Sequence, residues 1–264
     1  MEEDFSKYNG KGTILRKAQL RMLAILLEVD KICKKHDIRY WLDFGTLLGA
    51  VRHGGFIPWD DDVDITVFRK DYKKLCSILK KELPDQLVMQ DRTTEKNYAA
   101  RYAKVRDRNS YVENINEGPR LKEEGIFIDI FYIEKVGFIG MKKVVDFFYG
   151  RCFRRIRGIA VRKKYEPVIA YCLWPFINSI ILTLRILSKI IPNDLYSYSY
   201  GIPFFTRCRG KDILPLKTVH FEGISFPVPN NQENYLRLHY GDYMKIPPVD
   251  KRAIHSTKIE FKRR

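Results

Sequence analysis

The sequence predicts a mixed α+β fold, in which a small mixed sheet is flanked by helices over roughly residues 14 to 135. Three observations support this class. Apolar residues recur at three- and four-residue steps from Ile14 to His36, which is typical of an amphipathic helix. The run DVDITVF (62–68) alternates polar and apolar residues, and GIFIDIFYI (125–133) is almost wholly apolar, so both are predicted strands. Strands interspersed with helices favour one compact core.

The other elements of this core follow from shorter patterns. Gly54, Gly55 and Pro58 interrupt any regular period, so residues 54–61 are predicted to be a loop. The remaining predictions, in chain order, are a strand at 38–44, a short helix at 45–53, a helix at 70–81 ended by Pro84, a strand at 86–90, and one or two strands within 98–113.

The composition changes after the core, which suggests a division at residue 135. Residues 1–135 are predicted to form the core, and residues 136–264 a largely helical, basic and apolar extension packed on it as one unit. The last part of the chain is loop-rich, with one short helix expected near residues 231–240.

The segment 151–191 combines cations with a long apolar run. Residues 151–164 carry seven cations and no acid, and residues 168–184 carry no charge but include Pro175. Three interpretations stay open: a buried helical hairpin broken at Pro175, a helix pair lying in the membrane interface and anchored by the cations, or a transmembrane span at the lower limit of length.

The charge balance predicts an anionic partner. The chain has 48 Lys+Arg against 32 Asp+Glu, a formal net charge of +16. A nucleotide, a nucleic acid or an anionic membrane surface would each suit this balance. The cations are not interleaved with aromatic residues in an RNA-binding signature, and the acidic block described below would repel a phosphate backbone, so nucleic acid is not an expected partner.

Cysteine usage and the first residues bear on the compartment. The five cysteines are scattered and form no C-x-x-C pair, which argues against both a disulfide framework and a zinc site. The segment MEEDFSKYNG has no apolar signal region. We therefore expect reduced thiols and a cytoplasmic protein.

The acidic run WDDDVDITV is the strongest functional signal. The two-residue period of a strand places Asp62 and Asp64 on one face, where two carboxylates repel each other near an apolar core. A divalent cation would relieve that repulsion, and hard oxygen ligands suit Mg²⁺ or Mn²⁺. Asp129, inside the second buried strand, supplies a third carboxylate, and three carboxylates from two strands are typical of metal-dependent phosphoryl transfer.

Two other interpretations of this run fit the sequence less well. A calcium loop would need glycine where the chain has Ile65. A solvated acidic loop would explain Asp60 and Asp61, but it would not explain Asp64 or Asp129 inside apolar strands.

The segment upstream of the acids supplies groups suited to an anionic substrate. Gly45 would let the backbone approach a phosphate, and Thr46 would add a hydroxyl at a helix N-terminus. Arg52, two turns further on, could reach the same phosphates. For His53 two interpretations stay open, a role in stabilising the loop and a substrate contact.

The segments WLDFGTLLGAVRHGGFIPWDDDVDI, GIFIDIF and FEGISFPVP…YLRLHYGDYMKIPP resemble the LicD family of phosphotransferases, to which the fukutins are related. The resemblance covers roughly residues 25 to 255. It implies a nucleotidyltransferase-type fold in which residues 1–135 are the catalytic core. By position, Asp62 and Asp64 match the family's metal-binding Asp-x-Asp and Asp129 its third carboxylate, while Gly45, Thr46 and Lys104 match positions that meet the donor phosphates.

The resemblance also implies a reaction. A phospho-alcohol, with phosphocholine favoured, would move from a CDP-activated donor to a sugar hydroxyl with release of CMP and with Mg²⁺ or Mn²⁺ as cofactor. The implied acceptor is a cell-surface glycan such as teichoic acid, capsule or lipopolysaccharide. A lipid-linked acceptor would suit a cytoplasmic enzyme in peripheral contact with the inner face of the membrane.

Rival functions use the same residues differently. A nucleotidyltransferase moving NMP to a small molecule would share the three carboxylates but release pyrophosphate. A catalytically inactive binding module would have no need for all three carboxylates, which this chain retains.

Overall fold

The computed structural model describes residues 4–95, 98, 100–114, 121–156, 164–252 and 256–261. In chain order the elements are α1 (Ser6–Asn9), α2 (Ile14–Lys35), β1 (Tyr40–Leu42), α3 (Phe44–His53), β2 (Asp64–Phe68), α4 (Arg69–Glu82), β3 (Leu87–Gln90), β4 (Ala103–Asp107), β5 (Ser110–Asn114), β6 (Phe127–Lys135), α5 (Ile139–Ile156), α6 (Glu166–Ile190), β7 (Leu195–Tyr198), β8 (Cys208–Arg209), α7 (Gly210–Ile213), β9 (Lys217–Phe221), β10 (Ile224–Val228), α8 (Gln232–Tyr240), a 3-10 turn (Val249–Lys251) and β11 (Ser256–Phe261).

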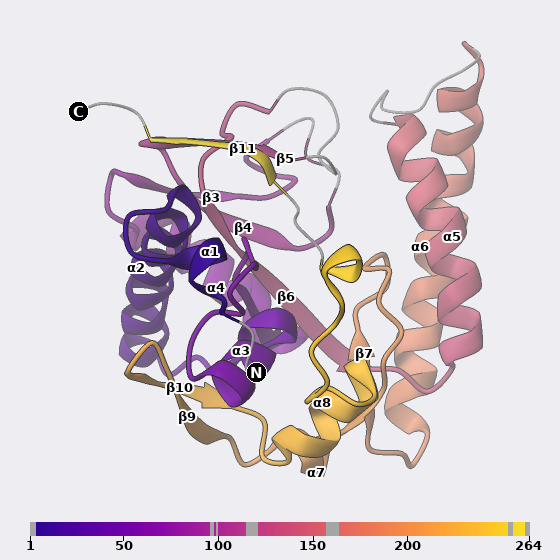
Figure 1. The fold of residues 1–264 in the computed structure, drawn as a ribbon. Helices are drawn as coiled ribbons and strands as arrows, with labels where there is room; N and C mark the ends of the chain where they lie inside the picture. The colour runs from indigo at the N-terminus through magenta and orange to yellow at the C-terminus, as the bar shows by residue number, and fades with distance from the viewer. Residues whose placement is uncertain are drawn as a thin grey trace.

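A mixed sheet forms the centre of the molecule (Figure 1). Its strands run in the order β1-β2-β6-β4-β3, and β7 and β8 continue the sheet from β6. The β2–β6 pair is parallel and the other pairs are antiparallel. The mixed α and β class predicted from the sequence is therefore confirmed.

The two faces of this sheet carry different neighbours. On one face Tyr132 of β6 stacks on Tyr72 of α4, with ring centroids 4.0 Å apart. On the other face Phe131 contacts Phe44 at the start of α3, with centroids 5.3 Å apart. Because alternate residues of a strand point to opposite faces, Asp129 shares the second face with Phe131.

The N-terminal elements lie close to their predicted positions. The long helix α2 begins after Thr13, whose side chain caps it by accepting a hydrogen bond from the Arg16 N–H. Helix α3 begins one residue earlier than predicted, at Phe44, and β2 begins at Asp64 rather than at Asp62. Asp62 therefore lies in the loop that leads into the strand.

The later half of the chain is less helical than predicted. The expected boundary at residue 135 coincides with the end of β6, but β7 and β8 then return to the same sheet. The antiparallel hairpin of β9 and β10 and the pairing of β11 with β5 were not predicted. Helix α8 was expected near residues 231–240 and is present.

Helices α5 and α6 pack side by side as a hairpin at one side of the sheet (Figure 1). They have a small apolar core of their own, which includes Tyr149, Phe153 and Ile181. Of the three interpretations, the one with a break at Pro175 is wrong on that point, because α6 is continuous through that residue. Three of the seven cations that could anchor the helices to a membrane, Arg157, Arg162 and Lys163, lie outside the described residues.

Candidate active site

A row of polar residues crosses the otherwise apolar sheet. Asp64 of β2 is the direct register partner of Asp129 of β6, and Asp129 is the partner of Lys104 of β4. Residues directly opposite one another on neighbouring strands point to the same face. The structure thus brings together Asp64, Asp129 and Lys104, which the sequence had placed in three separate segments.

Asp60 and Asp62 complete an acidic cluster with Asp64. Burial, followed by the charge of Asp62, raises the pKa of Asp60, which also shares a hydrogen bond with the Asp62 carboxylate. Burial raises the pKa of Asp64 well above its ordinary value, and the charges of Asp62 and Asp129 raise it further. Asp60 and Asp64 are buried and Asp62 is half-buried, so the cluster meets solvent at Asp62.

Asp129 differs from the other acids because a cation is paired with it. Lys104 Nζ lies 2.7 Å from Asp129 Oδ1, and the Phe127 ring covers the same ammonium group at 3.3 Å from its centroid. Burial raises the pKa of Asp129 to about 6, and the Lys104 charge limits that rise. The sequence had suggested that Lys104 meets donor phosphates, whereas in this structure it neutralises a carboxylate of the cluster.

The donor chemistry of the cluster suits a hard divalent cation. Its carboxylates raise one another's pKa, and a divalent ion held between them would relieve that repulsion. Across the described part of the chain, however, no three His, Cys, Asp or Glu side chains form a ready ligand set. Asp62 and Asp64 could hold such an ion after side-chain rotation, while Asp129 would first have to leave Lys104.

Gly45 makes room for Asp60. A Cβ atom at residue 45 would lie 2.5 Å from Asp60 Oδ2, closer than such contacts allow. The sequence suggested that Gly45 lets the backbone approach a phosphate. In the structure the space beside Gly45 is filled by a carboxylate of the acidic cluster instead.

Replacing Gly45 with alanine should therefore displace the Asp60 carboxylate and lower catalytic turnover roughly tenfold or more, because a small misplacement at a reacting centre is costly. The melting temperature should change little, since only the end of a side chain has to move. Gly150→Ala is the matched control, because nothing lies within 4 Å of a Cβ built there. Unchanged turnover in the Gly45 variant would contradict this role.

Thr46 and Arg52 form hydrogen bonds with backbone groups of other segments. The Thr46 hydroxyl accepts the Asp64 backbone N–H at 2.8 Å, so it fixes the start of β2. An Arg52 Nη1 donates to the Tyr243 backbone oxygen at 2.7 Å and thereby binds the segment after α8. The structure thus gives both side chains a structural role, and their contact with a phosphate stays a prediction.

His53 has a structural environment. Its Nε2 accepts a hydrogen bond from Arg52 Nε at 3.0 Å, and its ring lies against Phe5 and Trp59. Burial, with a smaller contribution from the Arg52 charge, lowers its pKa to about 4. A neutral ring among aromatic side chains favours the loop-stabilising interpretation over a substrate contact.

Asp43 is a residue that the sequence reasoning missed. It is fully buried, and its Oδ1 accepts hydrogen bonds from the Phe44 N–H at 2.8 Å and from the Tyr235 hydroxyl at 3.0 Å. Its Oδ2 accepts from the Tyr198 hydroxyl at 2.7 Å and from the Thr66 hydroxyl. The Asp43 N–H also donates to the Asp64 carbonyl at 3.0 Å, so this network holds the strand that carries the acids. The signal was an acid between apolar residues in WLDFG, the same kind of signal as Asp129.

Tyr240, at the end of α8, faces the acidic cluster. Burial raises its pKa, and the charges of Asp64, Asp43, Asp60 and Asp62 raise it further. The residue is nevertheless 41% exposed, so it lies between the acids and solvent. The neighbouring Tyr235 is buried in the core, and the half-buried His239 stacks on its ring with centroids 4.9 Å apart.

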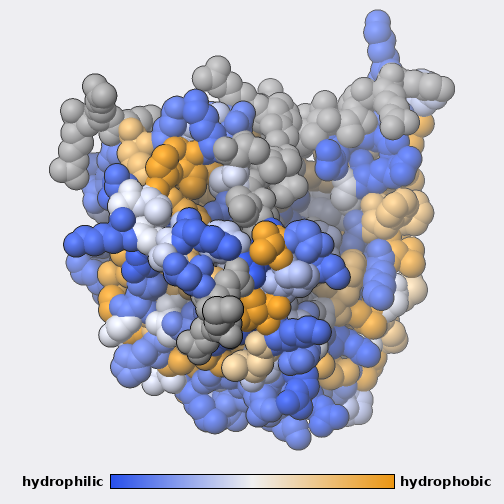
Figure 2. Space-filling view, in the orientation of Figure 1, coloured by the Kyte–Doolittle hydropathy of each residue, from blue (hydrophilic) through white to orange (hydrophobic). Residues whose placement is uncertain are grey.

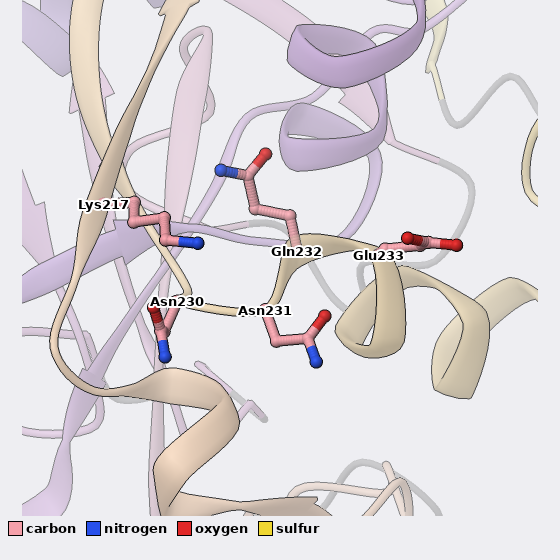
Figure 3. A pocket seen from close by; sticks show the side chains of 5 residues that line it. All are labelled: Lys217, Asn230, Asn231, Gln232 and Glu233. Atoms are coloured by element: carbon pink, nitrogen blue, oxygen red, sulfur yellow. The ribbon is translucent and has the colours of Figure 1, made fainter.

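A surface depression at the start of α8 is separate from these residues (Figure 3). It is lined by Lys217, Asn230, Asn231, Gln232 and Glu233. Asn231 caps α8 by accepting the Asn234 N–H at 3.1 Å, so its side chain already has a structural role. None of the clustered carboxylates lines this depression.

Comparison with known proteins agrees with this geometry. Residues 37–153, which contain the acidic cluster, Lys104 and Asp129, match the family model described as LicD/FKTN/FKRP, nucleotidyltransferase domain. The lipopolysaccharide cholinephosphotransferase LicD of Haemophilus influenzae is 28% identical over 270 residues, covering 93% of this chain and 97% of that protein. Residues 37–153 therefore resemble the nucleotidyltransferase domain of the LicD family.

A second relative shares only the most specific segment. The human ribitol 5-phosphate transferase FKRP is 59% identical over 34 residues, which cover 13% of this chain and 7% of that protein. Its name and that of the Haemophilus LicD both describe transfer of a phosphorylated alcohol. The nucleotidyltransferase description of the family model is consistent with the mixed sheet and the position of its acids.

Proposed function

We propose that this protein is a transferase that moves a phospho-alcohol, with phosphocholine favoured, from a CDP-activated donor to a hydroxyl of a cell-surface glycan. Support comes from the full-length similarity to a lipopolysaccharide cholinephosphotransferase. The structural observation that carries the proposal is the register of Asp64 beside Asp129, which builds an acidic cluster on one face of the sheet. Teichoic acid, capsule and lipopolysaccharide are the candidate acceptors.

Mg²⁺ or Mn²⁺ is the proposed cofactor. Asp62 and Asp64 would hold the ion; Asp129 could serve as a third ligand only by giving up Lys104, and the proposed reaction uses the form in which this pair is intact. A bound divalent ion supplies positive charge that neutralises phosphate oxygens in transferases of this kind. The half-buried position of Asp62 gives such an ion access from solvent.

The proposed reaction also needs a base for the acceptor hydroxyl, and the chain supplies one. The acceptor hydroxyl oxygen attacks the phosphorus that bears the alcohol, the bond from this phosphorus to the CMP oxygen breaks, and CMP leaves. Asp129 accepts the hydroxyl proton, a role for which a pKa of about 6, raised by burial, is suitable near neutral pH. Protonation of Asp129 removes the charge that holds Lys104, so the Lys104 ammonium group could then pair with a phosphate oxygen of the departing CMP.

Removal of divalent ions and a comparison of donors test this proposal together. We expect the purified protein to release CMP from CDP-choline in the presence of Mg²⁺ and an acceptor glycan, and to stop when EDTA is added, because the phosphate charge is then no longer neutralised. Chromatography of the nucleotides and mass spectrometry of the glycan provide the readouts. Excess Mg²⁺ added back should restore turnover, which separates metal removal from damage to the protein.

The outcome also discriminates against the rival nucleotidyltransferase. That enzyme would release pyrophosphate from a nucleoside triphosphate and leave CDP-choline intact. A panel of CDP-alcohols, including CDP-ribitol, identifies the transferred group. Turnover that persists in EDTA would refute the metal-dependent form of the proposal.

The proposed location is the cytoplasm, at the inner face of the cell membrane. Support comes from the five free cysteines, four of them buried, and from the supply of CDP-activated donors that the reaction needs. An acceptor carried on a lipid would bring the substrate to the same surface.

A further inference from the structure

Helix α6 leaves most of its apolar surface in water. Its buried residues are Ala170, Ile177, Ile181, Leu184 and Ser188, which form one stripe along the helix. By length and composition α6 could cross a membrane, yet only 22% of its most apolar window is buried. Soluble proteins rarely leave so long an apolar surface exposed without a partner. The interpretation of residues 168–184 as part of a buried core is therefore wrong.

The exposed apolar side chains surround the rest of the helix. At 100° per residue they cover an arc of about 200° of its circumference. The members of this set on α6 are Val168, Ile169, Tyr171, Leu173, Phe176, Ile180, Leu182, Ile186, Leu187 and Ile190. A flat protein surface would cover a narrower face, whereas a fluid apolar layer can follow such an arc.

Three uncharged polar side chains of α6 are satisfied within the helix. Asn178 donates to the Trp174 carbonyl at 2.7 Å, and Thr183 donates to the Ser179 carbonyl at 3.0 Å. Ser188 donates to the Leu184 carbonyl at 2.6 Å. Such back-bonding to the helix satisfies polar groups without water, as an apolar environment requires.

Helix α5 adds a second apolar edge with cations beside it. Met141, Val144, Phe147 and Phe148 are 47–59% exposed. Arg151 and Arg154 follow them on the exposed side of α5, and Lys164 precedes α6. Figure 2 shows hydrophobic residues gathered along the edge formed by the hairpin, with hydrophilic residues at its upper end.

We propose that the α5–α6 hairpin lies in the interface of an anionic membrane. The exposed apolar arc would enter the boundary between headgroups and acyl chains, and Arg151, Arg154 and Lys164 would bind lipid phosphates. The bond between Arg185 and Glu134, with Nε 2.8 Å from Oε2, ties α6 to the last part of β6 and so keeps the hairpin on the domain. The protein would thus be attached peripherally to the membrane. This proposal follows from the exposed surface of the hairpin and does not depend on the proposed transferase activity.

Vesicle flotation tests this attachment. The purified chain should float with vesicles that contain roughly a third phosphatidylglycerol in phosphatidylcholine, and binding should be several-fold weaker to phosphatidylcholine alone or at about 1 M salt. The double variant Phe176→Gln/Ile180→Gln should lose at least about tenfold in binding. Arg151→Gln/Arg154→Gln should lose the preference for anionic vesicles while retaining the apolar contribution.

A matched control uses exposed apolar residues on another helix. Ile14→Gln/Leu20→Gln changes two side chains of α2 that are 59% and 47% exposed, and it should leave flotation unchanged. Circular dichroism and CMP release on a soluble acceptor should be unchanged in all variants, so failure of docking is distinguishable from failure of the enzyme.

Three results would overturn the proposal. The first is a chain that does not float with anionic vesicles at low salt. Sedimentation would then show whether the hairpin instead forms a dimer. The second is membrane association that resists alkaline carbonate extraction, which would indicate a span. The third is equal loss of binding in the α2 control.

Discussion

Replacing Asp64 with asparagine should lower turnover by about a hundredfold to a thousandfold while the protein stays folded. The amide keeps the shape of the side chain but removes a charge that the proposed cation needs. Asp64 also faces Asp62 and Asp129, whose charges add to burial in raising its pKa. The melting temperature of the metal-free variant should therefore equal or exceed that of the native chain, because an unfavourable buried charge has been removed.

Two measurements check this expectation. CMP release reports turnover, and differential scanning calorimetry near neutral pH reports stability. Asp85→Asn is the control, because that acid is exposed, lies between α4 and β3, and does not belong to the cluster. A folded Asp64→Asn protein that keeps roughly a tenth of native turnover would argue strongly against the assigned role.

The second large effect is on stability. Replacing Asp43 with alanine should destabilise the fold by about 3 kcal/mol or more, because the buried hydroxyl groups of Thr66, Tyr198 and Tyr235 would lose their acceptor. For a chain of this size such a change lowers the melting temperature by about 10 °C. Thermal and urea unfolding measure the loss.

Single-donor variants show whether the network is cooperative. Tyr198→Phe and Tyr235→Phe each remove one hydroxyl group and should each cost about 1 kcal/mol, less than the loss of the shared acceptor. Combining either change with Asp43→Ala should not add to the loss of stability. The hydroxyl group that Asp43→Ala leaves without an acceptor is absent from the double variant. An Asp43→Ala protein as stable as the native chain would contradict the structural role of this carboxylate.

The acidic cluster could be predicted because its signal is local. An acid inside a short apolar strand is costly unless it serves a site, and both Asp64 and Asp129 lie in such strands. Each strand was recognisable from its own period. The direct pairing of the two strands is a long-range feature that the structure supplies.

The partners of Asp43 could not be predicted for the opposite reason. Tyr198 and Tyr235 lie 155 and 192 residues away along the chain, and the chain has 16 tyrosines. No local pattern distinguishes these two from the others. The hydrogen-bond partners of Thr46 and Arg52 were equally unpredictable, because they are backbone groups of other segments, the Asp64 N–H and the Tyr243 carbonyl.

The exposure of α6 was beyond the sequence for a different reason. Composition showed a helix without charges over residues 168–184, but it could not show how much of that surface α5 covers. In the structure α6 packs on α5 and buries only one stripe of its surface. The exposure of the remaining apolar surface favours the interfacial interpretation over the buried one.

The long-range closure of the Asp43 network has a consequence for synthesis on the ribosome. Asp43 is translated well before Tyr235 of α8, which lies 192 residues further along the chain. Strand β5 likewise has to wait for β11, its distant partner. The Asp43 carboxylate and the edge of β5 therefore lack these partners on the ribosome until the later segments have emerged.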